Sequence, residues 1–212
     1  MTRKEVSKAV LKRLPGYLAY LKTLADTGTP YISATALANA LGMGEVQVRK
    51  DLAMVSDGGR PKIGYLRESL IDDIEQFLGY DNTTDAVLIG AGKLGQALCG
   101  YSGFEAYGLN ILAAFDSDPT VCQTEEGTPI YPMEKLESFC KANKVLMGII
   151  TVPARYAQEV CDKLIACGIK AVWSFATSHL EVPEGILVQY ENMATSLAVL
   201  SMHLQAQIKE KK

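Results

Sequence analysis

The chain has 212 residues, enough for one large or two modest domains, and its 48% hydrophobic and 21% charged residues are typical of a folded globular protein. No apolar run reaches the roughly 18 residues of a membrane span, and the start, MTRKEVSKAV, lacks the apolar core of a signal peptide, so we expect a cytoplasmic protein without a membrane partner. Five cysteines with no CxxC spacing and only two histidines argue against structural disulfides and a metal site.

The net charge of −3 combines two parts of opposite sign. Residues 1–67 contain eleven Lys and Arg against five Asp and Glu, a net of +6, whereas residues 68–212 contain ten against nineteen, a net of −9. A basic N-terminal part suits a polyanion such as DNA, and the acidic remainder would repel one. We therefore expect the two parts to have different partners.

The N-terminal part has the pattern of a helix-turn-helix. Residues 4–26 have the apolar periodicity of a helix in two pieces, with Pro15 in the first turn of the second piece. Ser33 is placed to cap a helix over 34–41, which a glycine would end, and a further helix is expected over 45–55. Two short helices joined by a tight turn are typical of a DNA-binding element.

The last of these helices has one apolar and one polar side. Its apolar side comprises Val48, Leu52 and Val55. Lys50 faces away from that side, between Gln47 and Arg49, with the small apolar side chains of Val46 and Ala53 nearby. Lysine and glutamine can bond base edges or phosphates, and small apolar groups can contact a thymine methyl, so we predict that Gln47, Arg49 and Lys50 bind a DNA groove.

A basic, turn-rich segment follows over residues 57–65, DGGRPKIGY. It is typical of the hairpin wing that accompanies such a helix, and we expect Arg60 and Lys62 to reach phosphate or the minor groove. The alternative is a small helical cap whose lysines are only solvated. The charge excess, the helix spacing and the basic hairpin together favour DNA binding.

The most specific pattern lies over residues 85–95, DAVLIGAGKLG. An apolar strand leads directly into Gly90-x-Gly92-x-x-Gly95, and Asp116 ends the next apolar run. In a dinucleotide site the first glycine makes the turn, the second admits the pyrophosphate and the third lets the helix pack on its strand, with phosphate at the helix N-terminus. Asp116 would bond the ribose hydroxyls and repel a 2′-phosphate, so NAD(H) is favoured over NADP(H). The alternative is a structural turn in which Asp116 only caps a strand.

Apolar strands and helices alternate beyond a linking helix over 67–78 and a polar boundary over 79–84. We expect strands over 111–115, 145–150 and 169–174 and helices over 133–142 and 154–166. Continuously apolar strands indicate a parallel sheet covered on both faces, the Rossmann layout of an α/β fold. Ligand contacts there come from the carboxyl ends of strands. The predicted cofactor-binding residues are Gly90, Ala91, Gly92, Lys93, Leu94, Gly95, Tyr101, Asp116, Thr151, Val152, Pro153 and Phe175; for Tyr101 and Phe175 core packing is the stronger alternative.

A long terminal helix is expected over 191–208. Its apolar seam comprises Met193, Leu197, Leu200, Leu204 and Ile208, and Ala194, Ala198 and Met202 keep the reverse face apolar. One isolated domain would not bury both faces, so we predict that this helix packs into a partner subunit of a two-fold dimer. The alternative is a terminal helix lying on its own sheet. The predicted domains are a DNA-binding domain over 1–80, a nucleotide-binding domain over 81–190 and the dimerisation helix over 191–212.

With these motifs in order, the chain resembles the Rex family of redox-sensing transcriptional repressors over nearly its full length. The matching segments are KRLPGYL at 12–18, VQVRKDL at 46–52, IGY at 63–65, IGAGKLGQAL at 89–98, AAFDSDP at 113–119, IITVPA at 149–154 and VPEGILV at 182–188.

The resemblance implies a winged helix, an NAD(H)-binding Rossmann domain and a homodimer with swapped C-terminal helices. It implies a repressor that occupies palindromic operators when NADH is scarce and leaves when NADH rises, while NAD⁺ competes for the pocket without driving release. Tyr101 matches the family tyrosine near the nicotinamide, and Phe175 matches the aromatic residue of a loop that reads SFAT here. Two positions depart from the family: an aspartate of the terminal helix is Asn192 and an N-domain arginine is Ala19.

Two other classes of function compete with this interpretation. The same glycine loop serves NAD-dependent oxidoreductases, but such an enzyme needs a substrate domain and a proton donor, and only His179 and His203 are present. A bare CoA- or nucleotide-binding module leaves the basic helix-turn-helix unexplained. We therefore predict no catalytic residues.

Overall fold

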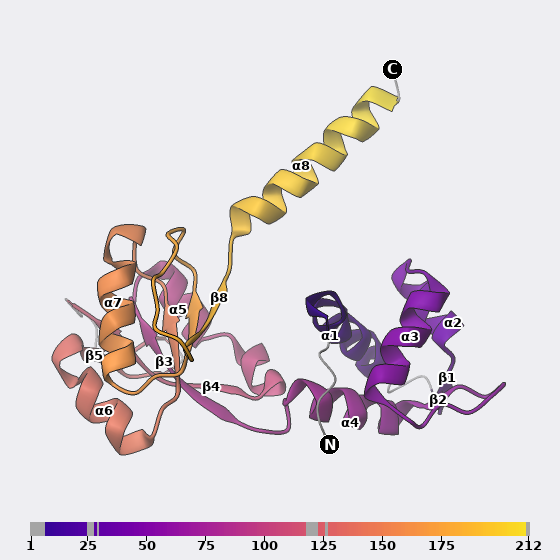
Figure 1. Cartoon of the computed structure of the whole chain (residues 1–212), viewed down its shortest axis with the longest axis horizontal. Helices are drawn as coiled ribbons and strands as arrows, with labels where there is room; N and C mark the ends of the chain where they lie inside the picture. The colour runs from indigo at the N-terminus through magenta and orange to yellow at the C-terminus, as the bar shows by residue number, and fades with distance from the viewer. Residues whose placement is uncertain (1–6, 25–27, 29, 118–122, 126, 211–212) are drawn as a thin grey trace. The chain divides into compact units, whose positions relative to one another are not determined.

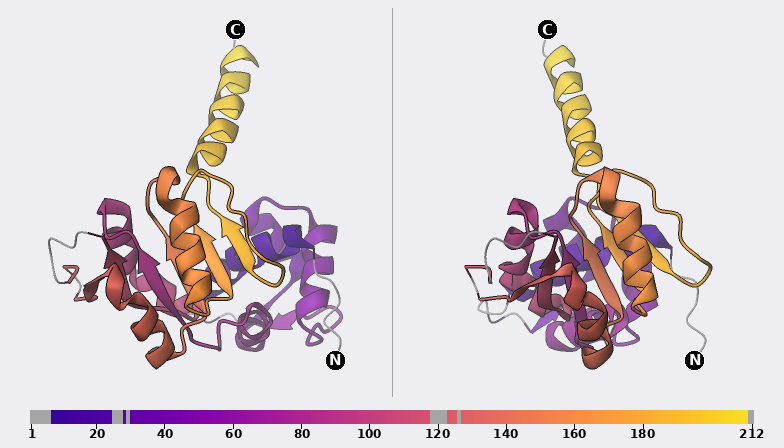
Figure 2. Two further views of the ribbon diagram at one scale, coloured as in Figure 1. Left: turned by 60° about the vertical axis from the view of Figure 1, so that its left-hand side comes forward. Right: turned by 90° about the vertical axis from the view of Figure 1, so that its left-hand side faces the viewer.

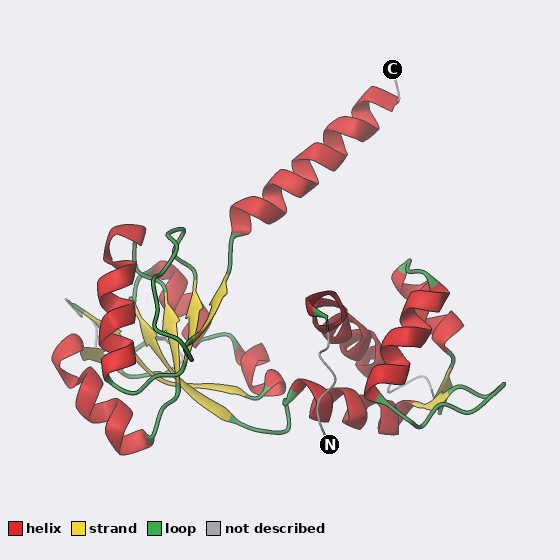
Figure 3. Cartoon of the chain, viewed as in Figure 1, coloured by secondary structure: helices red, strands yellow, loops and turns green. Residues whose placement is uncertain are grey.

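A computed structural model describes residues 7–24, 28, 30–117, 123–125 and 127–210. The chain divides into two compact units, Met1–Asn82 and Thr83–Lys212. The first is mainly helical and the second contains the large sheet, as the colours of Figures 1 and 3 show.

Unit 1 is a bundle of helices closed by two short strands. Its elements are α1 (Lys8–Thr23), β1 (Tyr31–Ile32), α2 (Ala34–Leu41), α3 (Glu45–Val55), β2 (Tyr65–Leu66) and α4 (Arg67–Leu78). β1 and β2 pair antiparallel. The fully buried side chains of this core come from all four helices: Leu14, Tyr17, Leu18, Leu21, Leu37, Val48, Leu52, Leu70 and Ile74.

The first helix corrects the two-piece prediction, because α1 runs without a break through Pro15. A proline inside a helix removes one hydrogen bond and costs about 3 kcal/mol. Here the residues on both sides of Pro15 bury one common stripe, which includes Leu14, Leu18 and Leu21. Each buried leucine contributes roughly 1.5–3 kcal/mol, so continuing the helix is favoured over a break. Residues 4–6, 25 and 26 of the predicted helix lie outside the described residues.

The helix-turn-helix prediction is confirmed in detail. The Ser33 hydroxyl accepts a hydrogen bond from the Ala36 amide at 3.0 Å and caps α2, and Gly42 ends that helix with φ of 64°, in the left-handed region that glycine adopts at little cost. α3 then begins at Glu45 and ends at Val55. Capping by Ser33 and termination at Gly42 place α2, whereas α3 has no side-chain cap and is placed by its apolar spacing.

A buried carboxylate joins α1 to α3. Asp51 is only 3% exposed, and its two oxygens accept hydrogen bonds from Arg13 Nε at 2.8 Å and Arg13 Nη2 at 2.9 Å. The Tyr17 hydroxyl donates to the same carboxylate at 2.8 Å. Burial, followed by the hydrogen bond to Asp51, raises the pKa of Tyr17 to about 12. The two-pronged Arg13 contact fixes both position and angle of α3 on α1.

Unit 2 contains a sheet of six parallel strands in the order β5-β4-β3-β6-β7-β8. The strands are β3 (Thr84–Ile89), β4 (Leu109–Asp116), β5 (Ile130–Pro132), β6 (Met147–Ile150), β7 (Ala171–Ser174) and β8 (Leu187–Tyr190). The helical elements are α5 (Lys93–Cys99), η2 (Ser102–Tyr107), η3 (Met133–Lys135), α6 (Leu136–Asn143), α7 (Ala154–Ala166) and α8 (Met193–Glu210).

Both faces of this sheet are covered, as the alternation of side chains in β3 shows. Val87 and Ile89 pack in one core with residues of α6 and α7, whereas Ala86 and Leu88 pack in a second core that α5 borders. Figure 2 shows α7 lying along one face of the strands. This is the predicted doubly covered α/β layout.

Several boundaries in unit 2 differ from the predictions. β5 and β8 were missed, because β5 is three residues long with Pro129 before it and Pro132 at its end, and β8, Leu187–Tyr190, contains Gln189 and gives no continuous apolar run. The strands predicted from 145 and 169 begin two residues later, at Met147 and Ala171. The predicted helix over 133–142 starts with a 3-10 turn before α6.

The terminal helix does not lie on its own sheet. α8 begins at Met193 rather than 191, and each of its residues from 193 to 209 is exposed. The five residues of the predicted seam are all more than half exposed, from Ile208 at 53% to Met193 at 68%. The helix is about 27 Å long at 1.5 Å per residue. Among the described residues, no helix is long and apolar enough to cross a membrane.

We expect Asp51→Ala to lower the free energy of unfolding of unit 1 by about 3 kcal/mol, because it leaves Tyr17 and Arg13 without their shared buried acceptor. Urea denaturation measures the loss, and hydrogen exchange of peptides from α1 and α3 assigns it to unit 1.

The matched control is Glu45→Ala, which removes the exposed ion pair between Glu45 and Arg49 on the same helix. Its expected effect is below about 0.5 kcal/mol. Equal stability of the two variants would show that Asp51 does not hold α3 in place.

Candidate functional site

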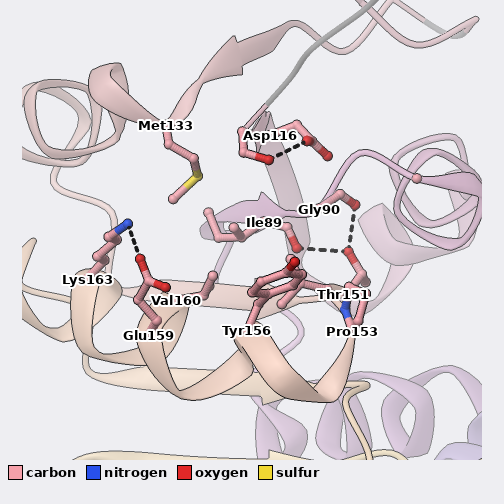
Figure 4. Close-up of a pocket in the computed structure, with 13 residues that line it drawn as sticks. Ile89, Gly90, Asp116, Met133, Thr151, Pro153, Tyr156, Glu159, Val160 and Lys163 are labelled. Carbon is pink, nitrogen blue, oxygen red and sulfur yellow. Dashed lines mark hydrogen bonds and ion pairs between the residues drawn. The ribbon is translucent and has the colours of Figure 1, made fainter.

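The first candidate site lies at β3, from which the following strands are added first on one side, β4 and β5, and then on the other, β6, β7 and β8. β3 is central, pairing with β4 on one side and β6 on the other, and ligands of such sheets bind outside the carboxyl ends of the strands at this point. A cavity of about 460 Å³ opens there (Figure 4). Its lining residues are Ile89, Gly90, Gly92, Asp116, Ser117, Met133, Thr151, Val152, Pro153, Tyr156, Glu159, Val160 and Lys163.

The first and third glycines of the motif are required by close packing. Gly90 has φ of 104°, and a Cβ there would lie 2.9 Å from the side chain of Val152. A Cβ at Gly95 would overlap with the carbonyl oxygen of Gly90, so only glycine lets α5 approach β3. Gly92 differs, because nothing lies within 4 Å of its added Cβ. The second glycine therefore faces open space, as a position that admits a ligand should.

Three side chains hold the glycine turn in shape. The Thr151 hydroxyl lies 2.9 Å from the carbonyl oxygen of Ile89 and 2.7 Å from that of Gly90 (Figure 4). The Ala91 amide donates to Asp116 Oδ2 at 2.8 Å, and the Ala91 carbonyl accepts from Gln96 Nε2 at 2.8 Å. Asp116 therefore contacts the turn as well as facing the cavity. Gln96 was missed, because no local pattern shows that its side chain turns back to Ala91.

The far wall of the cavity comes from α7 and was also missed. Tyr156, Glu159, Val160 and Lys163 line it, and Met133 faces them from the start of η3 (Figure 4). Glu159 and Lys163 form an ion pair at 2.8 Å. The signal available in the sequence was their spacing of three and four residues, which places them on one helix face directly after Pro153.

The cavity brings together six of the twelve predicted cofactor-binding residues: Gly90, Gly92, Asp116, Thr151, Val152 and Pro153. The other six, Ala91, Lys93, Leu94, Gly95, Tyr101 and Phe175, do not line it. Tyr101 is 53% exposed, so it is not a core residue. Phe175 is half-buried and packs on Trp173 with ring centroids 4.9 Å apart. Their predicted contacts with a cofactor stay predictions.

The second candidate site is the outer face of α3 in unit 1. Gln47, Arg49 and Lys50 are exposed, whereas Val48 and Leu52 are fully buried, so the predicted two-sided character of the helix is confirmed. Val46 is 64% exposed at the first turn. Arg49 is ion-paired with Glu45 one turn earlier. The face thus presents the hydrogen-bond donors of Arg49 and Lys50, the amide of Gln47, which can donate and accept, and the apolar side chain of Val46. Base edges in the major groove offer partners for each of these groups.

The predicted wing is a tight hairpin. Arg60 and Gly64 form an antiparallel bridge, with the Arg60 amide donating to the Gly64 carbonyl at 2.8 Å. Lys62 sits at its tip with φ of 67°, a conformation that residues other than glycine seldom adopt. Lys62 therefore places its charge at the exposed tip of the hairpin.

Among the described residues, no group of three or more metal-ligating side chains could hold a metal ion.

Two family models match parts of the chain. The model "Putative DNA-binding protein N-terminus" matches residues 5–53, and the model "CoA binding domain" matches residues 81–178. The first covers α1 to most of α3, and the second covers β3 to β7 with the glycine turn, whereas β8 and α8 lie outside it.

Longer similarities come from whole proteins. The chain is 42% identical over 193 residues to the redox-sensing transcriptional repressor Rex of Treponema denticola, covering 91% of this chain and 92% of that protein. It is 36% identical over 202 residues to the Rex repressor of Carboxydothermus hydrogenoformans, covering 95% and 97%.

Solved structures are also similar to this chain over nearly its full length. The Rex-family repressor RSP in complex with β-NAD⁺ and operator DNA matches with a TM-score of 0.88 and 33% identity over 98% of this chain and 96% of that one. The structure of RSP in complex with β-NADH matches with a TM-score of 0.86 over 99% and 100%.

Substitution of the second and third glycines separates packing from ligand access. We expect Gly95→Ala to destabilise unit 2 by about 1–3 kcal/mol, because its methyl group meets backbone. Gly92→Ala meets nothing, so unit 2 should keep its stability to within about 1 kcal/mol. The same Gly92→Ala variant should bind NADH at least about tenfold more weakly, because the methyl group occupies the approach to the pyrophosphate.

Denaturation by urea and calorimetric titration with NADH measure the two effects. Unchanged NADH binding by Gly92→Ala would contradict the placement of the pyrophosphate at this turn.

Proposed function

Because the chain belongs to the Rex family of redox-sensing transcriptional repressors, we propose that it represses transcription by binding operator DNA when NADH is scarce and leaves the operator when NADH rises. NAD⁺ would compete for the same pocket without causing release. The protein would act in the cytoplasm as a sensor, not as an enzyme.

One observation carries this proposal: a single chain combines a dinucleotide-type cavity in unit 2 with an exposed basic recognition face in unit 1. A nucleotide-binding enzyme or a bare nucleotide module has no use for the second feature. The similarity to structures that hold NAD⁺ with operator DNA, and NADH, extends over both units. It supports the repressor over the alternative NAD-dependent oxidoreductase.

The cavity suggests how the cofactor is held. The pyrophosphate would lie against Gly90 and Gly92, and the adenosine ribose would bond the Asp116 carboxylate. The adenine would enter between Val152 and the α7 wall, where Met133, Val160 and Tyr156 offer apolar contacts. The nicotinamide end would extend toward Tyr101 and Phe175, which lie outside this cavity. When bound, the cofactor supplies a ring whose charge reports the redox state.

The histidines support a sensor rather than an enzyme. Neither His179 nor His203 lines the cavity. His179 stacks on Tyr190 with centroids 5.5 Å apart, and His203 lies on the exposed α8.

On DNA, α3 would enter the major groove. Lys50 and Gln47 would contact bases or phosphates, and Arg60 and Lys62 of the wing would contact the backbone or the minor groove. Two copies are needed for a palindromic operator, and the exposed seam of α8 supplies an apolar surface for the partner subunit. We propose that the two α8 helices are exchanged between protomers.

The direct test is an operator-binding titration at fixed NAD⁺ and increasing NADH. Operator affinity should fall by about 5- to 150-fold at saturating NADH, the usual range of allosteric coupling, and bound operator should weaken NADH binding by the same factor. Fluorescence anisotropy of a labelled palindromic duplex measures the first effect, and calorimetry measures the second. Tight NADH binding with unchanged operator affinity would refute the sensor.

A second prediction concerns the recognition helix. Lys50→Ala should weaken operator binding and reduce the slope of log affinity against log salt by about one for each phosphate that the lysine neutralises in the wild type. Lys141→Ala removes another exposed lysine, from α6 of unit 2, and should leave the slope unchanged. Equal slopes for the two variants would argue against groove binding by α3.

A further inference from the structure

Four aromatic side chains form a continuous row on the α5 side of the sheet. The rings of Tyr101 and Phe104 meet edge to face with centroids 4.9 Å apart, and Phe104 meets Trp173 in the same way at 5.6 Å. Trp173 in turn contacts Phe175 at 4.9 Å. The row therefore joins the segment after α5 to β7, elements that are some 70 positions apart in the sequence.

Trp173, the third member of this row, contacts the segment between β8 and α8. Trp173 Nε1 donates a hydrogen bond to Glu191 Oε1 at 3.2 Å, and the Glu191 amide donates to the Ser174 carbonyl at 2.9 Å. In the described part of the chain, these two bonds are the hydrogen bonds that join residues 191–210 to the rest of unit 2. The Glu191 side chain therefore anchors the segment between β8 and α8 to Trp173.

The outer end of the row is open. Tyr101 is 53% exposed, whereas Phe104, Trp173 and Phe175 are half-buried. A planar ring that stacks against the exposed side of Tyr101 would extend this row of aromatic contacts to the ligand. A ring face also distinguishes the cationic oxidised nicotinamide from the neutral reduced one.

We propose that Trp173 and Glu191 are positioning residues that convert the binding of NADH, with its neutral ring beside Tyr101, into a change in the setting of α8. This inference rests on the proposed function, in which the nicotinamide lies near Tyr101 and α8 joins the two protomers. The alternative is that the row only fills the core of unit 2. The two interpretations differ in whether NADH binding can be separated from its effect on DNA.

The test uses full-length Trp173→Phe and Glu191→Ala. The first keeps an aromatic ring but has no N–H donor, and the second removes the acceptor. Each variant is measured for NADH affinity by calorimetry and for the ratio of operator affinities without and with saturating NADH. We expect NADH affinity to stay within about threefold while that ratio falls by about tenfold.

Two controls accompany these variants. Glu191→Gln keeps an acceptor oxygen and should retain most of the ratio, and Gln189→Ala removes an exposed side chain of β8 and should change nothing. The double variant Trp173→Phe/Glu191→Ala should lose no more than either single one, because both changes break the same bond.

A spectroscopic readout is built in, since Trp173 is the single tryptophan. NAD⁺ should change its emission, whereas ADP-ribose, which lacks the nicotinamide ring, should bind without that change. Equal emission changes with both ligands would overturn the proposal.

The remaining outcomes distinguish failure of the proposed repressor function from failure of the positioning role of Trp173 and Glu191. If the wild-type protein holds operator DNA regardless of NADH, the proposed function itself fails. If the wild type responds and both variants respond with the same ratio, the repressor stands and the positioning role is overturned. A loss of NADH affinity beyond about tenfold in either variant also overturns it, because the residues would then belong to the binding pocket.

Discussion

The parallel pairing of β3 with both β4 and β6 is the constraint on which the nucleotide cavity depends. It brings the ends of three strands to one edge, so that Gly90, Asp116 and Thr151 meet although 61 positions separate the first from the last. The turn after β3 is held by the hydrogen bonds of Thr151, Asp116 and Gln96. Gly95 lets α5 approach the strand behind it. The pocket is therefore a consequence of sheet topology, and the side chains that line it add selectivity to a shape already present.

In unit 1 the orientation of α3 is fixed by a buried charged group. A helix that must present Lys50 outward needs a fixed angle on its neighbours, and leucine packing alone tolerates small rotations. The carboxylate of Asp51, held by Arg13 and Tyr17, removes that freedom because a two-pronged hydrogen bond has a preferred plane. The hydrogen bond to Asp51 also raises the pKa of Arg13 above its ordinary value, so the guanidinium stays charged.

Features encoded within a few residues could be predicted from the sequence. Ser33 as a cap, Gly42 as a helix end and the glycine turn after β3 each follow from local chemistry. Features that depend on distant partners could not be predicted. Pro15 is tolerated only because both flanks of α1 bury the same stripe, Asp51 finds its partners 34 and 38 positions away, and the α7 wall with Tyr156 becomes visible only once the sheet has formed.

The family's aspartate and arginine that help to report the bound state are replaced in this chain. Ala19 and Asn192 carry no charge, so no ion pair can form between these positions. The Asn192 side-chain oxygen instead accepts hydrogen bonds from the amides of Ala194 at 3.0 Å and Thr195 at 3.3 Å, capping α8. A ligand can shift an equilibrium only by its difference in affinity for the two states. In this chain the difference in NADH affinity between the two states must therefore arise from contacts other than an ion pair between positions 19 and 192. Glu191 is the charged residue beside the cap, and its side chain bonds Trp173 of the aromatic row.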